Sequence, residues 1–253
     1  MTRIWDCLVF GTEDELPTLQ CRLATLAGAV HAHIICEARW DFWGRPKPML
    51  LADHASRFAA WDDRIVYVDA GPDVGQTAYA RAVNQRNALA VALDQLDIPG
   101  DDILMYSDVD EIPRPEHAGK VGKVLGMTYF AHSLWWKAHA PWVGTTADYR
   151  RNVTDLWGLA QKRWVWPGVP DAGWHLSWMG GPEAGARKLI TMADTPPEWF
   201  CKDVVEGTCW RDGWHWNGGL RFKLDAAVPG DWPPWCLENA PPEWARNPRR
   251  EAA

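Results

Sequence analysis

The sequence predicts an α/β fold in which a mostly parallel sheet is covered by crossover helices. The first half of the chain carries the pattern, because apolar runs of strand length alternate there with stretches of helical periodicity. The second half differs, since 15 of the 19 tryptophans lie at or after Trp135 and 12 of the 19 prolines lie beyond Phe130. We therefore expect a Trp-rich second half made of loops and short strands.

The predicted elements follow in order along the chain. Ile4 to Phe10 is an apolar run typical of a strand, and a helix with leucines at positions 16, 19, 23 and 26 ends at Gly28. Further patterns predict strands at 30–36, 64–68 and 102–106 and a long helix at 78–96. Parallel strands of this kind bind ligands at their carboxyl ends. The segments to inspect are therefore 11–15, 37–48, 69–76 and 107–113.

Composition limits the classes of function. The 253 residues are 47% apolar and 23% charged with a net charge of −7, which predicts one domain over 1–253. We expect two halves, 1–128 and 129–240, and a tail at 241–253. The acidic balance argues against nucleic acid as a partner. Without a signal peptide or a run of roughly 18 apolar residues that could span a membrane, we expect a cytoplasmic protein with its six cysteines as free thiols.

Three carboxylates follow the last of these predicted strands, in the segment Asp108-Val109-Asp110-Glu111. On an extended backbone residues two apart face the same side, so Asp108 and Asp110 can converge on one point. Converging carboxylates repel each other unless a cation lies between them, and oxygen ligands favour Mg²⁺, Mn²⁺ or Ca²⁺. The alternative is a solvated acidic turn. The position at the end of a buried strand favours the metal site.

Several blocks of residues occur in an order that resembles a known family. They are Asp6-Cys7, 19–23 with Arg22, Glu37, 44–48, Arg86-Asn87, 107–113, 173–181 and Lys188. Together they resemble glycosyltransferase family 17, whose best-known members are the β-1,4-mannosyl-glycoprotein N-acetylglucosaminyltransferases that add bisecting GlcNAc. The resemblance implies a Rossmann-like GT-A fold and a nucleotide-sugar donor such as UDP-GlcNAc. It also implies Mn²⁺ or Mg²⁺ at the Asp-x-Asp motif and inverting transfer to a glycan or other hydroxyl acceptor.

The sequence departs from that family in two places. Eukaryotic members resemble secretory proteins with a membrane anchor and a stem, which are not found here, so we expect a bacterial or viral setting. The histidine-containing stretch expected after Lys188 is replaced by 191–198.

Several side chains are candidates for binding the donor. Glu37, at the end of the second strand, can accept hydrogen bonds from a ribose or uracil, and Arg86 can pair with a phosphate. Asn87 and Lys47 are candidates of the same kind, and Asp108 can contact the ribose. For each of them the alternative is an ordinary surface side chain.

His175 is the candidate third metal ligand beside Asp108 and Asp110, because many GT-A enzymes complete the metal shell with a later histidine. The alternative is a histidine packed in the core. His215 is a less favoured second candidate, and His31 and His33 are expected to be neighbours within the sheet.

Exposed tryptophans are suited to stacking on the C–H face of a sugar. Trp135, Trp142 and Trp214 stand beside Gly, Pro or His in expected loops and are the candidates for acceptor binding. The rings of Trp164, Trp174 and Trp178 fit core packing, and for any single tryptophan the core is the better interpretation.

Inverting transfer needs a base that removes the proton of the acceptor hydroxyl. Glu111 is the first candidate because it adjoins the metal motif, although its side chain begins on the face opposite to Asp110. Asp171, Asp194 and Glu198 are rivals from the second half.

The sequence thus predicts a metal-dependent inverting glycosyltransferase, with GlcNAc as the expected sugar. Two other functions compete with it. A phosphatase of the haloacid dehalogenase type also uses Asp-x-Asp at a strand end, but on its first strand. A non-enzymatic, Trp-rich carbohydrate-binding protein with a structural Ca²⁺ would bind sugar without binding a nucleotide.

Overall fold

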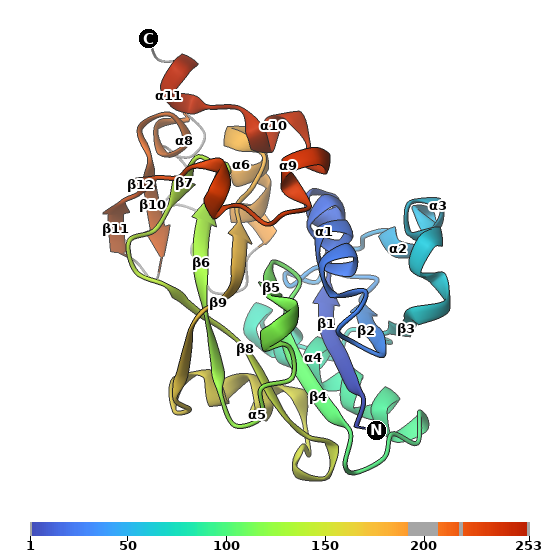
Figure 1. The fold of residues 1–253 in the computed structure, drawn as a ribbon. Helices are drawn as coiled ribbons and strands as arrows, with labels where there is room; N and C mark the ends of the chain where they lie inside the picture. The colour runs from blue at the N-terminus through green and yellow to red at the C-terminus, as the bar shows by residue number, and fades with distance from the viewer. Residues whose placement is uncertain (1, 192–206, 218–219, 252–253) are drawn as a thin grey trace.

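The computed structural model describes residues 2–191, 207–217 and 220–251, and Figure 1 traces the chain. The strands are β1 (Ile4–Phe10), β2 (Ala32–Glu37), β3 (Ile65–Asp69), β4 (Ile103–Asp108), β5 (Glu111–Pro113), β6 (Val124–Ala131), β7 (Trp136–Lys137), β8 (Trp142–Tyr149), β9 (Gly168–Ser177), β10 (Trp214–Asn217), β11 (Leu220–Lys223) and β12 (Asp225–Ala226). The helices are α1 (Leu16–Leu26), α2 (Leu50–Asp53), α3 (Ala55–Phe58), α4 (Ala78–Gln95), α5 (Leu156–Gln161), α6 (Gly181–Thr191), α8 (Thr208–Asp212), α9 (Cys236–Asn239), α10 (Pro242–Ala245) and α11 (Pro248–Glu251).

Four parallel strands form the first half of the main sheet, in the order β3-β2-β1-β4. The register places Phe10 of β1 beside Glu37 of β2, and Val9 beside Asp108 of β4. The carboxyl ends of these strands therefore meet at one edge of the sheet. The Rossmann-like α/β arrangement predicted from the sequence is confirmed.

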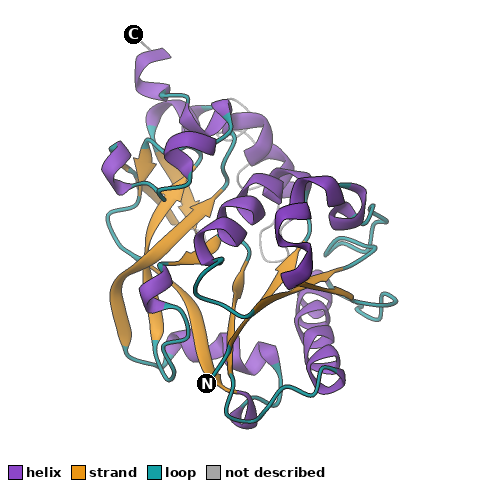
Figure 2. Ribbon diagram, turned by 45° about the vertical axis from the view of Figure 1, so that its right-hand side comes forward, coloured by secondary structure: helices purple, strands orange, loops and turns teal. Residues whose placement is uncertain are grey.

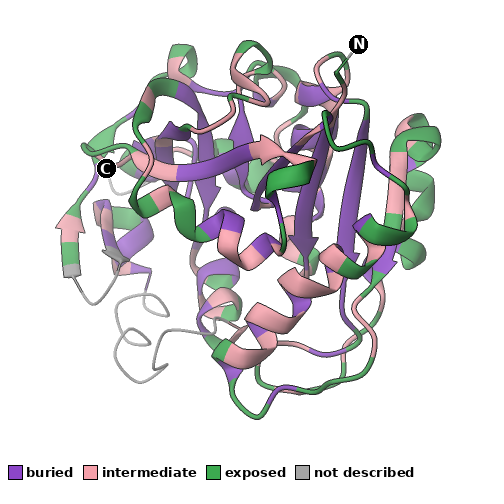
Figure 3. Cartoon of the chain, turned by 90° about the horizontal axis from the view of Figure 1, so that it is seen from below, coloured by how far each residue is buried: buried purple, intermediate pink, exposed green. Residues whose placement is uncertain are grey.

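Helices cover both faces of this parallel half because the side chains of β1 alternate between two cores. Cys7 and Val9 pack with Leu89 of α4, whereas Leu8 and Phe10 pack with the apolar face of α1. Figure 2 shows helices on both sides of the sheet, and Figure 3 shows that the central strands are buried along most of their length.

The second half of the sheet is mainly antiparallel. β8 runs antiparallel to β4, β6 to β8, and β7 and β12 continue the edge. β9 lies parallel to β6 and antiparallel to β5, so that His175 pairs with Glu111 on one side and Tyr129 on the other. At this crossing a Cβ added to Gly173 would lie 2.4 Å from the carbonyl oxygen of Ile112. The register of β9 thus brings a histidine to the end of the acidic segment.

The structure corrects two expectations about the second half. The short strands expected there include β6 and β8 of eight residues each and β9 of ten residues. The segment 241–253, expected to be a tail, contributes Trp244, which is 2% exposed and packs with Trp174 and Cys236. The chain therefore folds back onto the sheet near its C-terminal end.

Two further findings concern the cysteines and helices of the described residues. Five cysteines of this part of the chain are free thiols, namely Cys7, Cys21, Cys36, Cys209 and Cys236. Among the helices that the structure describes, none is both long enough and apolar enough to cross a membrane.

Candidate active site

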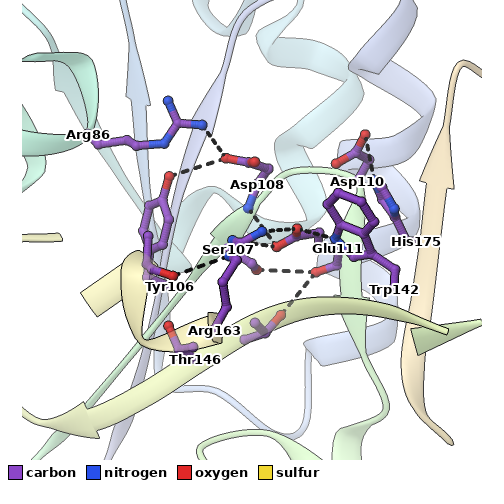
Figure 4. A network of polar contacts seen from close by, with 12 residues as sticks. Arg86, Tyr106, Ser107, Asp108, Asp110, Glu111, Trp142, Thr146, Arg163 and His175 are labelled. Atoms are coloured by element: carbon purple, nitrogen blue, oxygen red, sulfur yellow. Dashed lines mark hydrogen bonds and ion pairs between the residues drawn. The ribbon is translucent and has the colours of Figure 1, made fainter. Parts of the chain in front are cut away.

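The acidic segment turns sharply after β4. Asp108 is the last residue of β4, Val109 and Asp110 form a turn, and Glu111 begins β5. We expected the two aspartates to share one face because we assumed an extended backbone. The turn interrupts that backbone, so the expectation is wrong. Figure 4 shows the two carboxyl groups facing different partners. They nevertheless lie close enough for the charge of Asp110 to raise the pKa of Asp108.

Asp108 faces the long helix α4. Its Oδ1 accepts hydrogen bonds from Nη2 of Arg86 at 2.8 Å and from the hydroxyl of Tyr106 at 3.2 Å. Burial favours the neutral acid, but the charges of Arg86 and Arg163 outweigh burial and lower the pKa of Asp108. The side chain is 35% exposed. Asp108 is therefore an ionised carboxylate that solvent can reach.

Asp110 faces β9 and α6. Its Oδ2 lies 3.1 Å from Nζ of Lys188 and 3.4 Å from Nε2 of His175. Burial alone would raise the pKa of Asp110, but Lys188 and His175 hold it well below its usual range. The imidazole of His175 packs against the rings of Tyr129 and Trp142, with its centroid 4.6 Å from the centroid of each. These two aromatic rings fix the orientation of the histidine toward the carboxylate.

Glu111 is fully enclosed and makes hydrogen bonds with both oxygens. Oε1 accepts from the indole of Trp142 at 2.6 Å and from Nη1 of Arg163 at 2.8 Å. Oε2 accepts from Nη2 of Arg163 and from the backbone N–H of Asp108, each at 3.3 Å. A base needs a lone pair that faces the acceptor hydroxyl. The geometry favours an anchoring role for Glu111 over the catalytic role expected from the sequence.

The other candidate bases lie elsewhere. Asp171, near the start of β9, has a side chain that is 73% exposed and pairs with Arg114 at 2.8 Å. Asp194 and Glu198 lie outside the described residues. The residues around Asp108 and Asp110 thus do not single out a base.

The side chain of a buried arginine, Arg22, holds the acidic turn through hydrogen bonds. Arg22 of α1 donates to both oxygens of Asp6, at 2.6 and 2.9 Å, and to Oγ of Ser107 at 2.7 Å. Its Nη1 also donates to the carbonyl oxygens of Asp108 at 3.0 Å and Glu111 at 2.7 Å. One side chain therefore links β1, the end of β4 and the start of β5.

A pocket opens beside Asp110 at the carboxyl ends of β1 and β4. Its volume is about 290 Å³. The walls come from the segment after β1, the start of α1, the end of β9 and the helix α6. Polar groups lining it include Thr12, Glu15, Thr18, Asp110, Arg187 and Lys188. Such a pocket has room for a small polar ligand next to the acidic turn.

The residues fit a divalent ion in part. A carboxylate oxygen and an imidazole nitrogen, from Asp110 and His175, are together and suit Mn²⁺ or Mg²⁺. Within the described ranges, no group of three or more His, Cys, Asp or Glu side chains could hold a metal ion. Mg²⁺ often takes one or two carboxylates and completes its shell with substrate phosphates. Two protein ligands beside a pocket suit a site of that kind.

The remaining donor candidates are already bound within the chain. The buried carboxylate of Glu37 accepts from the backbone N–H groups of Leu50 at 2.6 Å and Leu51 at 3.1 Å. Lys47 lies 3.1 Å from the same carboxylate. Asn87 accepts from the backbone of Trp157 at 3.4 Å. These contacts hold the loop after β2 and the first turn of α5, and the donor roles remain predictions.

The three acceptor candidates are not loop residues of one cleft. Trp142 lies on β8 beside His175, and Trp214 lies on β10 with Lys223 5.0 Å from its ring centroid. Trp135 lies between β6 and β7, where its indole donates to the carbonyl of Ala245 at 2.7 Å. Only Trp142 of these three contacts the acidic turn directly, through Glu111.

The expectations for the other tryptophans and for His215 are met only in part. Trp174 and Trp178 are buried as expected, whereas Trp164 is 65% exposed, so the core role expected for it is wrong. His215 is buried, with its Nε2 2.5 Å from the hydroxyl of Tyr129 and its Nδ1 3.1 Å from Nε2 of His132. It therefore lies behind Tyr129 rather than beside Asp110.

Three cations of the site carried no functional role in the sequence analysis: Arg22, Arg163 and Lys188. A signal existed for Arg22, because it is a charged residue between apolar positions of an amphipathic helix. Lys188 was visible only as part of the family pattern. Arg163 lies in a short 3-10 turn, Lys162–Trp164, and no pattern in the sequence marks it.

The acidic turn follows β4 at the carboxyl ends of the parallel strands, which is where open α/β sheets bind their ligands. The model of glycosyltransferase family 17 matches residues 1–179, and the chain belongs to this family. A search of curated proteins found no match to the chain. The protein is therefore a glycosyltransferase, and its carboxylate motif follows the fourth strand, unlike the first-strand motif of haloacid dehalogenase phosphatases.

Proposed function

We propose that this protein is a metal-dependent inverting glycosyltransferase that moves GlcNAc from UDP-GlcNAc to a hydroxyl group of a glycan or similar acceptor. The observation that carries the proposal is the pairing of Asp110 with His175 beside a pocket at the carboxyl ends of β1 and β4. Sheet edges of this kind bind nucleotides. UDP-GlcNAc is the proposed donor because the motifs resemble those of N-acetylglucosaminyltransferases.

In this proposal Asp110 and His175 hold Mn²⁺ or Mg²⁺ together with the donor phosphates. The ion would supply Lewis-acid stabilisation of the negative charge that develops on the departing nucleoside diphosphate. Asp108 is held toward α4 by Arg86 and is proposed to accept a hydrogen bond from the ribose. Glu111 keeps Arg163 and Trp142 in place beside it.

The acceptor is proposed to approach along Trp142. This indole covers His175 and comes from β8, on the side of the turn opposite to the parallel strands. A ring with an apolar face suits the C–H face of a sugar. The acceptor hydroxyl would then arrive close to the metal ligands.

The test compares Asp110→Asn with wild type. Donor binding is measured by calorimetry with UDP-GlcNAc, once with Mn²⁺ and once with EDTA, and turnover is measured as UDP released in the presence of an acceptor glycan. We expect Asp110→Asn to lose metal-dependent binding and turnover while keeping its fold, because the substitution removes a charged ligand without changing the side-chain volume. Asp101→Asn is the matched control, since Asp101 is an exposed aspartate paired with Arg151.

Two results would contradict the proposal. Equal affinity of wild type for the donor in Mn²⁺ and in EDTA would exclude the metal-dependent mechanism. Turnover of Asp110→Asn at the wild-type rate would exclude Asp110 as a ligand.

A further inference from the structure

Lys188 occupies an unusual place for a lysine. It projects from α6, and its ammonium group lies 3.1 Å from the carboxylate of Asp110. Burial works against its charged form, but Asp110 and Glu15 raise the pKa of Lys188, so the group carries a full positive charge. The ammonium group of Lys188 thus contacts Oδ2 of Asp110, the same oxygen that faces His175.

A second basic side chain that lines the pocket is engaged elsewhere. Arg187, the preceding residue of α6, makes two hydrogen bonds to Asp14, at 2.8 and 2.7 Å. A third contact, from Arg45 to the carbonyl oxygen of Ile190 at 2.7 Å, also holds α6. The helix is therefore fixed against the segment after β1, and Lys188 extends from a fixed base on a flexible four-carbon stem.

We propose that Lys188 is a ligand of the donor diphosphate, and that it gives up Asp110 to the divalent ion when the donor binds. The inference rests on the proposed function, because it needs a nucleotide sugar and a metal at Asp110. A divalent ion and an ammonium group repel each other and compete for one carboxylate oxygen. Once the ion takes Asp110, the ammonium group needs another anion, and a diphosphate in the pocket is within its reach.

If Lys188 exchanges Asp110 for the donor diphosphate, one substitution should change the affinities for Mn²⁺ and for UDP in opposite directions. Lys188→Met leaves Asp110 without its ammonium partner, so Mn²⁺ should bind the nucleotide-free protein several-fold more tightly than it binds wild type. The same variant should bind UDP in the presence of Mn²⁺ about 10- to 100-fold more weakly, the range of one charge-assisted hydrogen bond. Uridine, which has no phosphate, should bind both proteins equally.

Both affinities are measured by calorimetry, and circular dichroism checks the fold. Lys188→Gln is the second variant. It serves if Lys188→Met fails to fold without a donor to Asp110, because the glutamine amide can still donate a hydrogen bond there. Lys123→Met is the control for the loss of one positive charge, since Lys123 is exposed and is not a pocket-lining residue. We expect it to bind Mn²⁺ and UDP like wild type.

The outcomes separate the two proposals. UDP affinity of the Lys188 variants equal to wild type would overturn the role of Lys188 while leaving the proposed function intact. Unchanged or weaker Mn²⁺ binding by these variants would overturn the exchange at Asp110. A wild-type protein that binds none of UDP, GDP and CMP with Mn²⁺ would overturn both proposals.

Discussion

Replacing Arg22 with methionine should destabilise the protein more than most single substitutions. Arg22 is completely buried and forms a salt bridge with Asp6. The substitution keeps an unbranched apolar stem but removes the charge and every hydrogen bond of the guanidinium. Asp6 would then keep its 2.7 Å contact with Nδ1 of His33.

The magnitude follows from those contacts. Breaking a buried ion pair by removing one partner costs about 3 to 5 kcal/mol, because the other charge stays buried without compensation. The carbonyl oxygens of Asp108 and Glu111 lose a donor as well, at about 1 to 3 kcal/mol for each one left unsatisfied. The carbonyl oxygen of Glu111 keeps the hydroxyl of Ser107 at 3.2 Å. The loss at the carbonyl oxygen of Asp108 therefore adds to that of the ion pair, and we expect a total of about 4 to 8 kcal/mol.

Urea denaturation followed by circular dichroism measures the change in unfolding free energy. The matched experiment is a double-mutant cycle with Asp6→Asn, since the double variant buries neither charge. We expect the double variant to be less destabilised than the sum of the two single variants, by about 1 to 3 kcal/mol. A loss below about 1 kcal/mol for Arg22→Met, or additive effects in the cycle, would show that the buried ion pair does not hold the turn.

Two further predictions concern the strands behind the site. Gly173→Ala should destabilise the protein by about 1 to 3 kcal/mol, because the added Cβ would lie 2.4 Å from a backbone carbonyl oxygen of β5. The thermal unfolding midpoint measures this loss. Gly168→Ala is the control, because it lies on the same strand and its added Cβ would have nothing within 4 Å, so the midpoint should change little. Burial lowers the pKa of His132 from 6.5 to about 4, so between those pH values the unfolded chain binds more protons than the folded protein. Stability should therefore fall by about 3 kcal/mol as the pH drops from 6.5 to 4, and His132→Phe should remove part of this dependence. A urea midpoint of wild type that is constant over this range would contradict the burial of a neutral histidine.

The parallel half could be predicted from the sequence because its signals are local. A helix between two strands needs apolar residues at regular spacing, and the leucines of α1 and the apolar run of β1 supply them within short windows. The strand ends were missed by one or two residues, because burial at the edge of a sheet depends on what packs there. The long strands β6, β8 and β9 were missed because each contains at least one glycine, and β9 a proline, and these residues favour loops when each segment is considered alone.

The site was predictable in its residues and less so in its geometry. The position of Asp108 and Asp110 after β4 follows from the apolar run before them. Their different orientations depend on the turn at Val109, and that turn is held by Arg22 and Arg163 from distant parts of the chain. The tryptophans illustrate the same limit, because only the register of β8 brings Trp142 beside His175.

The contacts of the acidic turn have a consequence for the order of folding. Arg22 reaches the carbonyl oxygens of Asp108 and Glu111 across 86 and 89 residues of sequence, and Arg163 reaches the carboxylate of Glu111 across 52 residues. Contacts between segments so far apart in sequence form late and slow the search for the native state. Because these long-range contacts hold the turn, we expect its amide hydrogens to exchange with solvent through opening of the surrounding sheet. The proposed metal and donor site can therefore form only when the two halves of the chain have assembled.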